Sequence, residues 1–170
     1  ILSDISIDAA LLNSLDEKNT GVINTSELKT INGSFLDINK AFSTFGFNDL
    51  GIEAIVVDPE RVSVAEVNTL SSLTTGLLTA TVEEEDITAL LGIRDSGNAL
   101  AITVRELSVE ANILNILDGK TSVAVEVDSK NLKGTNADQI KAYEAFNEGT
   151  ITGLDNTFHA ASYLASHTDL

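Results

Sequence analysis

Aspartate offers the clearest potential for metal chemistry in this 170-residue chain, because three aspartates recur at the ends of predicted helices. Asp16, Asp118 and Asp155 each follow or end a predicted helix, next to turn residues whose backbone carbonyls are close by. Carboxylate and carbonyl oxygens are the ligands that calcium prefers. Because aspartate is also a common turn residue, the pattern leaves both a calcium site and a metal-free turn open.

Two other groups could hold a metal ion, but each has a simpler explanation. Residues 83–86 are four consecutive acidic residues before a predicted helix, where the helix dipole favours negative charge without any metal. The only histidines, His159 and His167, are eight positions apart, whereas a helical metal pair needs a spacing of four. We therefore expect no cofactor, with calcium at the three aspartates as the one exception.

Three asparagines occur inside predicted helices, where asparagine is a poor helix former. Asn13, Asn68 and Asn115 each lie in the same short pattern, an apolar residue, the asparagine, any residue and a leucine. A recurring residue of poor helix propensity needs a structural reason. We predict a buried ladder in which these side chains hydrogen-bond the loops of neighbouring coils, and the alternative is a role in binding.

The asparagines belong to a strand–helix unit that recurs along the chain. The apolar segments at 54–57 and 101–104 are each followed by an asparagine eleven positions after their last residue. Further on, residues match at a separation of 101 positions (134 − 33). The matching sets are Gly33, Asp37, Lys40, Ala41 and Phe42 against Gly134, Asp138, Lys141, Ala142 and Tyr143. Repeats of this length are typical of repeat proteins.

Residues 1–153 are predicted to form one repeat domain of six strand–helix units. The expected units are about 1–21, 22–51, 52–76, 77–97, 98–122 and 123–153, and residues 154–170 are expected to be a helical cap or the start of a further module. Counting eleven positions back from Asn13 reaches Leu2, so the strand of the first unit is expected to be almost wholly missing. The chain begins at Ile1 and contains no methionine, which indicates a segment of a longer protein.

Strands are predicted near 54–57, 78–82, 100–104 and 123–127, where apolar residues alternate with small or polar ones. Helices are predicted at about 35–45 and 84–91, and Asn136 is predicted to cap the helix that follows it. Strands joined through helices must run parallel. Because one face of these strands is polar, the pattern favours a right-handed α/β solenoid, with a one-sided parallel sheet and short helices on the other side. The alternative is a compact doubly wound α/β domain.

Composition and charge exclude several functional classes. The chain has no cysteine, so disulfides, a cysteine nucleophile and thiolate metal sites are excluded. With 26 acidic and 10 basic residues, the net charge is −16, which disfavours nucleic acid and anionic membranes as partners. No run of about 18 apolar residues could cross a membrane.

Several segments resemble repeats of very large secreted bacterial surface proteins, which are described as hemolysin-type (RTX-associated) or adhesin-like and include giant surface proteins of marine cyanobacteria. The segments are 12–21, 114–121, 33–51 and, separately, 160–170. The resemblance implies an extracellular, calcium-rich setting, a scaffold or adhesive role, and no catalytic residues. The glycine-rich nonapeptide that binds calcium in many such proteins is absent from this chain.

We therefore expect a non-catalytic structural or adhesive module of an extracellular bacterial surface protein. Its partners would be other copies, neighbouring repeats, or a surface carbohydrate or protein ligand. The residues expected to form the partner-binding surface are Thr79, Thr81, Ala101, Thr103, Ala124 and Glu126. The alternative is a calcium-stabilised carbohydrate-binding or carbohydrate-active solenoid, in which Glu83, Glu126 and Asp128 would have to converge as paired carboxylates.

Overall fold

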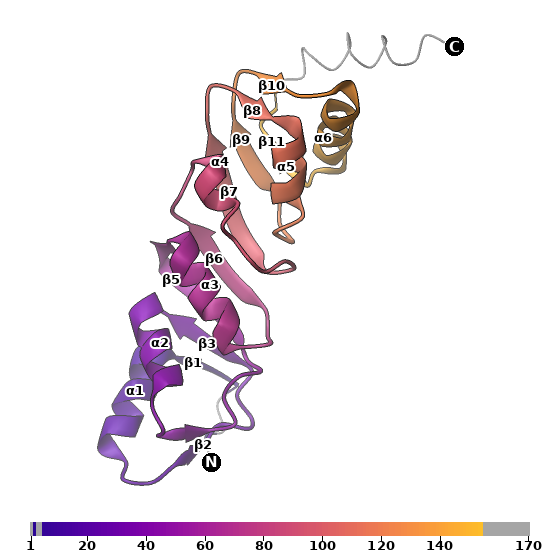
Figure 1. Cartoon of the computed structure of the whole chain (residues 1–170). Coiled ribbons are helices and arrows are strands. Elements are labelled where there is room, and N and C mark those ends of the chain that lie inside the picture. The colour runs from indigo at the N-terminus through magenta and orange to yellow at the C-terminus, as the bar shows by residue number, and fades with distance from the viewer. Residues whose placement is uncertain (1, 3–4, 155–170) are drawn as a thin grey trace. The chain divides into compact units, whose positions relative to one another are not determined.

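The computed structural model describes residue 2 and residues 5–154, and the chain is a mixed α/β protein within that part (Figure 1). Six helices alternate with the strands along the sequence. They are α1 (Ala9–Lys18), α2 (Phe35–Ser43), α3 (Val64–Leu73), α4 (Ile87–Leu90), α5 (Ala111–Asp118) and α6 (Asn136–Glu148). Residues 155–170, which include Asp155, both histidines and the expected cap, lie outside the described residues.

Seven strands form a parallel sheet in the order β1-β3-β5-β6-β7-β9-β11. The strands are β1 (Ser6–Asp8), β3 (Thr30–Gly33), β5 (Ala54–Val62), β6 (Leu78–Val82), β7 (Ala99–Arg105), β9 (Val125–Asp128) and β11 (Ile151–Thr152). The expected strands near 54–57, 78–82, 100–104 and 123–127 therefore correspond to β5, β6, β7 and β9, and the prediction of an α/β fold with a parallel sheet is confirmed.

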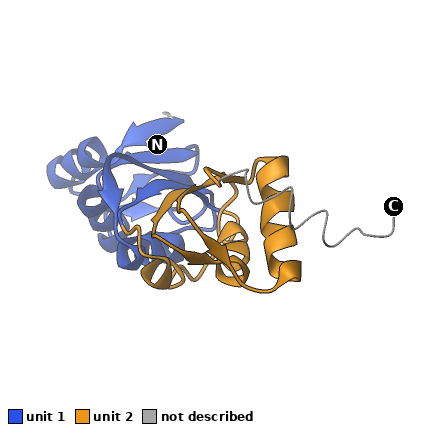
Figure 2. Ribbon diagram, turned by 90° about the horizontal axis from the view of Figure 1, so that it is seen from above, with its two compact units in different colours: residues 1–83, 98–100 blue, residues 84–97, 101–170 orange. Residues whose placement is uncertain are grey.

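The chain divides into two compact units (Figure 2). The first comprises residues 1–83 and 98–100, and the second comprises residues 84–97 and 101–170, so β7 begins in the first unit and ends in the second. Each expected strand–helix segment of 1–153 contains one of the six helices.

The core of the first unit is built on a row of aliphatic side chains that are in register across its strands. Ile31 lies between Ile7 on β1 and Ile55 on β5, and Ile55 also pairs with Leu78 on β6. All four side chains are buried, whereas the next residues along β3, β5 and β6 are partly accessible. This alternation results from the period of two along a strand, and it explains why the helices of the unit bury one face of the strands.

The second unit repeats this construction. Ile102 on β7 pairs with Val125 on β9, which in turn pairs with Ile151 on β11, and these three side chains are at most 2% exposed. Leu114 and Leu117 of α5 are fully buried as well. The expected alternation at 100–104 and 125–127 thus corresponds to one buried and one accessible face of β7 and β9, whereas Val123, predicted to be on the buried face, precedes β9 and is 41% exposed.

Two short strand pairs show that the units contain the same internal repeat. They are β2 (Ile23–Asn24) with β4 (Phe47–Asn48), and β10 (Leu132–Lys133) with β8 (Val109–Glu110). The pair β1·β3 corresponds to β8·β10, because Ile7 faces Ile31 as Val109 faces Leu132. The pair β2·β4 likewise corresponds to β9·β11. Equivalent residues are 102 positions apart in α1 and α5 (111 − 9) and 101 apart in β3 and β10 (132 − 31).

This equivalence clarifies the start of the chain. A strand precedes α1 after all, but β1 is the counterpart of the short strand β8 and not of the long strand β7. The counterpart of Val104 in β7 is Leu2, whose backbone N–H donates to the Asn24 carbonyl at 2.9 Å. Counting along the sequence missed β1 because it assumed one strand per helix, whereas two strands, β7 and β8, precede α5 in the second unit.

Three predicted helix limits were wrong for local reasons. Helix α2 ends at Ser43 and not at residue 45, because Thr44 turns to an extended conformation, and Phe45 is 96% exposed. Helix α4 covers only 87–90 of the expected 84–91, because Asp86 is its N-cap and accepts from the Ala89 N–H. The N-cap of α6 is Thr135 and not Asn136, since the Thr135 hydroxyl accepts from the Asp138 N–H.

Candidate functional site

Two of the three helical asparagines, Asn13 and Asn115, join consecutive helices of the same unit. Asn13 is 5% exposed, and its side-chain N–H donates to the Asp37 carbonyl in the first turn of α2 at 3.0 Å. Asn115 donates in the same way to the Asp138 carbonyl in the first turn of α6, also at 3.0 Å. The acceptor is thus a neighbouring helix and not the predicted loop. Asn68 on α3 is partly buried.

The side-chain oxygens of these two asparagines are unusual. In the described part of the chain, Oδ1 of Asn13 and Oδ1 of Asn115 are buried and accept no hydrogen bond. An unmade hydrogen bond to a buried acceptor costs about 1–3 kcal/mol. The hydrogen bond that each side-chain N–H donates therefore has to offset this cost, which fits a role in joining helices.

The recurring aspartates bind hydroxyl groups of the next coil. Asp16 accepts from the Thr44 hydroxyl at 2.8 Å, and Asp118 accepts from the Thr150 hydroxyl at 3.2 Å. A Cβ on Gly46 would lie 1.5 Å from Asp16 Oδ1, so the carboxylate lies directly over that glycine. No group of three or more metal-binding side chains occurs among the described residues, and Asp155 lies outside them. Each of the two described aspartates thus bonds to a threonine of the next coil.

In both repeats a glycine lets the chain before a helix approach the start of the preceding helix closely. Gly33 precedes α2 with φ +142°, and a Cβ there would lie 3.4 Å from the Ala9 Cβ. Gly134 precedes α6 with φ +121°, and its Cβ would lie 3.6 Å from the Ala111 Cβ. Positive φ strains any other residue. The matching glycines of the sequence therefore mark the place where one coil lies against the preceding helix.

Two glutamates that the sequence reasoning missed cap helices of the preceding coil. Glu60 at the end of β5 accepts from the Phe35 N–H, the first residue of α2. Glu106, directly after β7, accepts from the Ile87 N–H, the first residue of α4, at 2.8 Å. Such N–H groups have no partner within the helix. The only signal in the sequence is a glutamate shortly after an apolar strand, which does not indicate a helix elsewhere.

The six residues predicted to bind a partner lie on or beside the accessible face of their strands. Thr79 and Thr81 are partly exposed on β6 in the first unit. In the second unit, Ala101 and Thr103 lie on β7, Glu126 lies on β9, and Ala124 directly precedes β9. The Thr103 hydroxyl donates to Glu126 Oε2 at 3.3 Å, so these two side chains are neighbours on this face.

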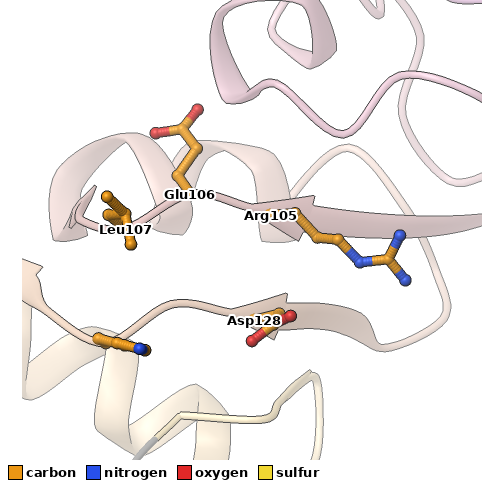
Figure 3. A pocket seen from close by; sticks show the side chains of 5 residues that line it. Arg105, Glu106, Leu107 and Asp128 are labelled. Carbon is orange, nitrogen blue, oxygen red and sulfur yellow. The ribbon is translucent and has the colours of Figure 1, made fainter.

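A surface pocket of about 270 Å³ lies at the ends of β7 and β9 in the second unit (Figure 3). Arg105 and Asp128 are paired across the two strands, and Leu107 is 77% exposed. Figure 3 shows Arg105 and Glu106 pointing away from one another. Arg105 forms an ion pair with Glu85 at 2.5 Å, and Lys130 completes the lining. Of the charged side chains that line the pocket, Arg105 and Glu106 are thus each bonded to a residue outside it, Glu85 and Ile87.

The carboxylates considered for catalysis belong to different units. Glu126 and Asp128 are exposed on the same face of β9, and Glu83 belongs to the first unit. The most buried carboxylate is Glu53, which is 1% exposed. Its Oε2 accepts from the Gly51 and Ile52 N–H groups at 2.8 and 3.1 Å, so it fixes the turn before β5.

One exposed ion pair joins α1 to α2. Lys40 and Glu17 are 2.7 Å apart, and their hydrogen bond lowers the pKa of Glu17 and raises the pKa of Lys40. The contribution of Glu17 to stability is present above its ordinary pKa and is lost as the pH falls through the lowered value. The contribution of Lys40 is present below its ordinary pKa and is lost as the pH rises through the raised value.

Comparisons with protein-family models, with curated proteins and with solved structures found no match to this chain. Within the described residues, none of the helices is both long and apolar enough to cross a membrane.

Proposed function

We propose that this chain is a non-catalytic scaffold or adhesive module of a large extracellular bacterial surface protein. In this proposal the fold is a right-handed α/β solenoid with a one-sided parallel sheet, and the accessible sheet face serves as the partner-binding surface. Right-handed crossovers are the general rule for parallel strands joined through a helix. The resemblance of the repeats to those of bacterial surface proteins supports the extracellular setting.

The observation that carries the proposal is the use of the polar side chains. The pairs Asn13–Asp37 and Asn115–Asp138 have the same geometry in the two units. The aspartate–threonine pairs that follow the helices recur in the same way. Polar side chains, of which Asn13 is buried, thus join one coil to the next, as a structural repeat requires.

The accessible sheet face is suited to a flat partner. Ala101, Thr103 and Ala124 are small, and small side chains let a partner approach the strands closely. A carbohydrate or protein ligand on the bacterial surface is the class of partner that this reading favours. The alternative, a carbohydrate-active solenoid, would use Glu126 and Asp128 of the same face.

A binding assay with two variants tests the proposal. The chain is immobilised and exposed to panels of bacterial surface polysaccharides and extracellular proteins, and release of reducing sugar is measured in parallel. Thr103→Lys should abolish capture of a ligand, whereas Glu144→Lys on the exposed side of α6 should leave capture unchanged. Hydrolysis of a polysaccharide that Glu126→Gln abolishes would establish the carbohydrate-active alternative. Ligand capture that Thr103→Lys does not change would refute the sheet face as the binding surface.

A further inference from the structure

Strand β4 has an open edge in the first unit. Within the described part of the chain, β4 belongs to a two-stranded sheet in which β2 is its one partner. On the β2 side, the Gly46 and Asn48 carbonyls accept backbone hydrogen bonds. Peptide groups alternate in direction along a strand, so the N–H and C=O groups of Phe47 point to the opposite edge. Adding an extended segment to such an edge is a common mode of peptide recognition.

The edge is open because the next coil is shorter. Residues 44–53 separate α2 from β5 and contain β4, whereas only residues 74–77 separate α3 from β6, and these form no strand. The two coils join beyond β4, where the Gly51 carbonyl accepts from the Thr75 N–H at 2.9 Å. The open edge therefore results from a difference between two internal coils, all of whose residues the structure describes.

The second unit shows which contacts the chain needs where it leaves a helix for such a strand. Thr150, between α6 and β11, makes two of them. Its hydroxyl donates to Asp118 at 3.2 Å, and its carbonyl accepts from the Val125 N–H at 2.9 Å. One residue is thus sufficient for both contacts.

In the first unit, the same contacts are divided between two residues. The Thr44 hydroxyl donates to Asp16 at 2.8 Å. The Gly46 carbonyl accepts from the Ile23 N–H at 2.8 Å. Phe45 is inserted between these two residues, and its side chain is 96% exposed. The repeat does not need Phe45, and an exposed aromatic side chain beside an open strand edge is typical of a binding surface.

The surroundings of this edge carry negative charge. Residues 43–53 contain Asp49 and Glu53 but no lysine or arginine, and residues 74–79 contain no charged residue. Proteins often protect a sheet edge with lysine or proline, and residues 44–48 contain neither. A positively charged segment would complement this charge. A second copy of the chain, with its net charge of −16, would be repelled.

We propose that the open edge of β4 is a docking site for an extended, positively charged segment of another protein, which adds as a strand beside β4. The segment bonds the N–H and C=O groups of Phe47 and packs an apolar side chain against Phe45. Its apolar residues occupy alternate positions, because successive side chains of a strand point to opposite faces. The site lies outside the seven-stranded sheet whose accessible face carries the proposed function.

A blocked peptide of the sequence Lys-Ile-Thr-Val-Thr-Ile-Lys is the probe. Titrated into the full chain and followed by NMR, it should cause saturable shifts at Phe45 and Asn48 and should slow exchange of the Phe47 amide. The control peptide Lys-Thr-Ile-Val-Ile-Thr-Lys has the same composition and charge, but its apolar residues no longer share one face of a strand, so it should bind more weakly. Replacing both lysines of the probe by glutamate should also weaken binding, because the surroundings of the edge are acidic.

Phe45→Ser removes the exposed aromatic side chain and should weaken binding of the probe at least about tenfold, which corresponds to about 1.4 kcal/mol. Leu36→Ser is the matched control, because Leu36 is 74% exposed at the start of α2, and it should leave the affinity unchanged. Asp49→Asn removes the exposed charge while keeping a residue that tolerates the φ of +67°, and it should reduce the affinity to a smaller extent.

The proposal is wrong if the probe causes no saturable change at about millimolar concentration, if the control peptide binds equally well, or if Phe45→Ser does not weaken binding. Dimerisation of the chain that Phe45→Ser abolishes would instead assign the edge to a second copy. Thr103→Lys, which tests the accessible face of the seven-stranded sheet, should leave binding of the probe unchanged. The two proposals can therefore fail independently.

Discussion

At the scale of single residues, the polar groups of the interior serve to connect neighbouring elements. Asn13 provides the clearest case, because its amide N–H is used while its Oδ1 is buried without a donor. The side chain therefore acts as a hydrogen-bond donor to the helix beside it, and its counterpart Asn115 does the same.

Asn13→Asp should lower the free energy of unfolding of the first unit by about 2–4 kcal/mol. The carboxylate cannot donate to the Asp37 carbonyl, and it adds a buried charge without a partner. Urea denaturation followed by hydrogen exchange of α1 and α2 measures the loss. Asn112→Asp is the matched control, because Asn112 is exposed on α5 and should change stability by less than about 0.5 kcal/mol. An equal effect of the two substitutions would exclude the donor role.

Glycine at position 76 allows a backbone contact that no other residue would permit. A Cβ there would lie 2.3 Å from the Glu53 carbonyl oxygen, and backbone atoms cannot move aside as a side chain can. Gly76→Ala should therefore destabilise the first unit by more than about 2 kcal/mol, the range of severe packing defects. Gly21→Ala, where no atom lies within 4 Å of the new Cβ, should be neutral or slightly stabilising in the same thermal melt. Similar melting temperatures for the two variants would contradict the close approach.

At the scale of elements, the sequence patterns predicted the strands well but the limits of the helices less well. The period of two at 78–82 and 123–127 reflects a physical cause, burial of one strand face, so the sequence shows it directly. The end of α2 depends on Thr44 meeting Asp16, which is 28 positions away. The short strands β1 and β2 depend on pairing with the distant strands β3 and β4. Interactions of this kind leave no local periodicity, so sequence patterns cannot reveal them.

The candidate sites were predictable only in part for the same reason. The asparagines and aspartates could be singled out because their recurrence is visible in one sequence. Their hydrogen-bond partners, such as the Asp37 carbonyl, could not be predicted, because backbone acceptors have no sequence signature.

Helix α4 provides a test at the scale of elements. It has only four residues. Its Ala89 N–H donates to the Asp86 side chain, and its Ile87 N–H donates to the side chain of Glu106 in the next coil. Glu106→Ala should cost about 0.5–2 kcal/mol, the usual range for a lost N-terminal cap, and should speed hydrogen exchange of α4 specifically. Glu106→Gln keeps a side-chain oxygen and should retain part of the protection. Unchanged exchange at Ile87 in Glu106→Ala would show that the bond contributes nothing to the helix.

At the scale of the whole molecule, charge is the dominant feature. The net charge of −16 is spread over a chain in which two ion pairs, Lys40–Glu17 and Arg105–Glu85, are exposed or partly exposed. Exposed ion pairs contribute little to stability and weaken as salt increases. Repulsion among the acidic residues acts in the opposite direction, because salt screens it and thereby stabilises the compact state.

The folded chain should therefore become more stable as sodium chloride is raised from about 0.01 M to about 0.1 M, where the screening length falls from about 30 Å to about 10 Å. The urea midpoint at pH 7 measures this effect. The double substitution Glu144→Gln and Asp128→Asn removes two exposed negative charges and should reduce the dependence of the midpoint on salt. Lys40→Gln removes a positive charge and the pair with Glu17, and should increase that dependence. A midpoint that falls with added salt would mean that attraction within the ion pairs outweighs repulsion among the acidic residues. The acidic side chains would then lie too far apart on the surface to repel one another.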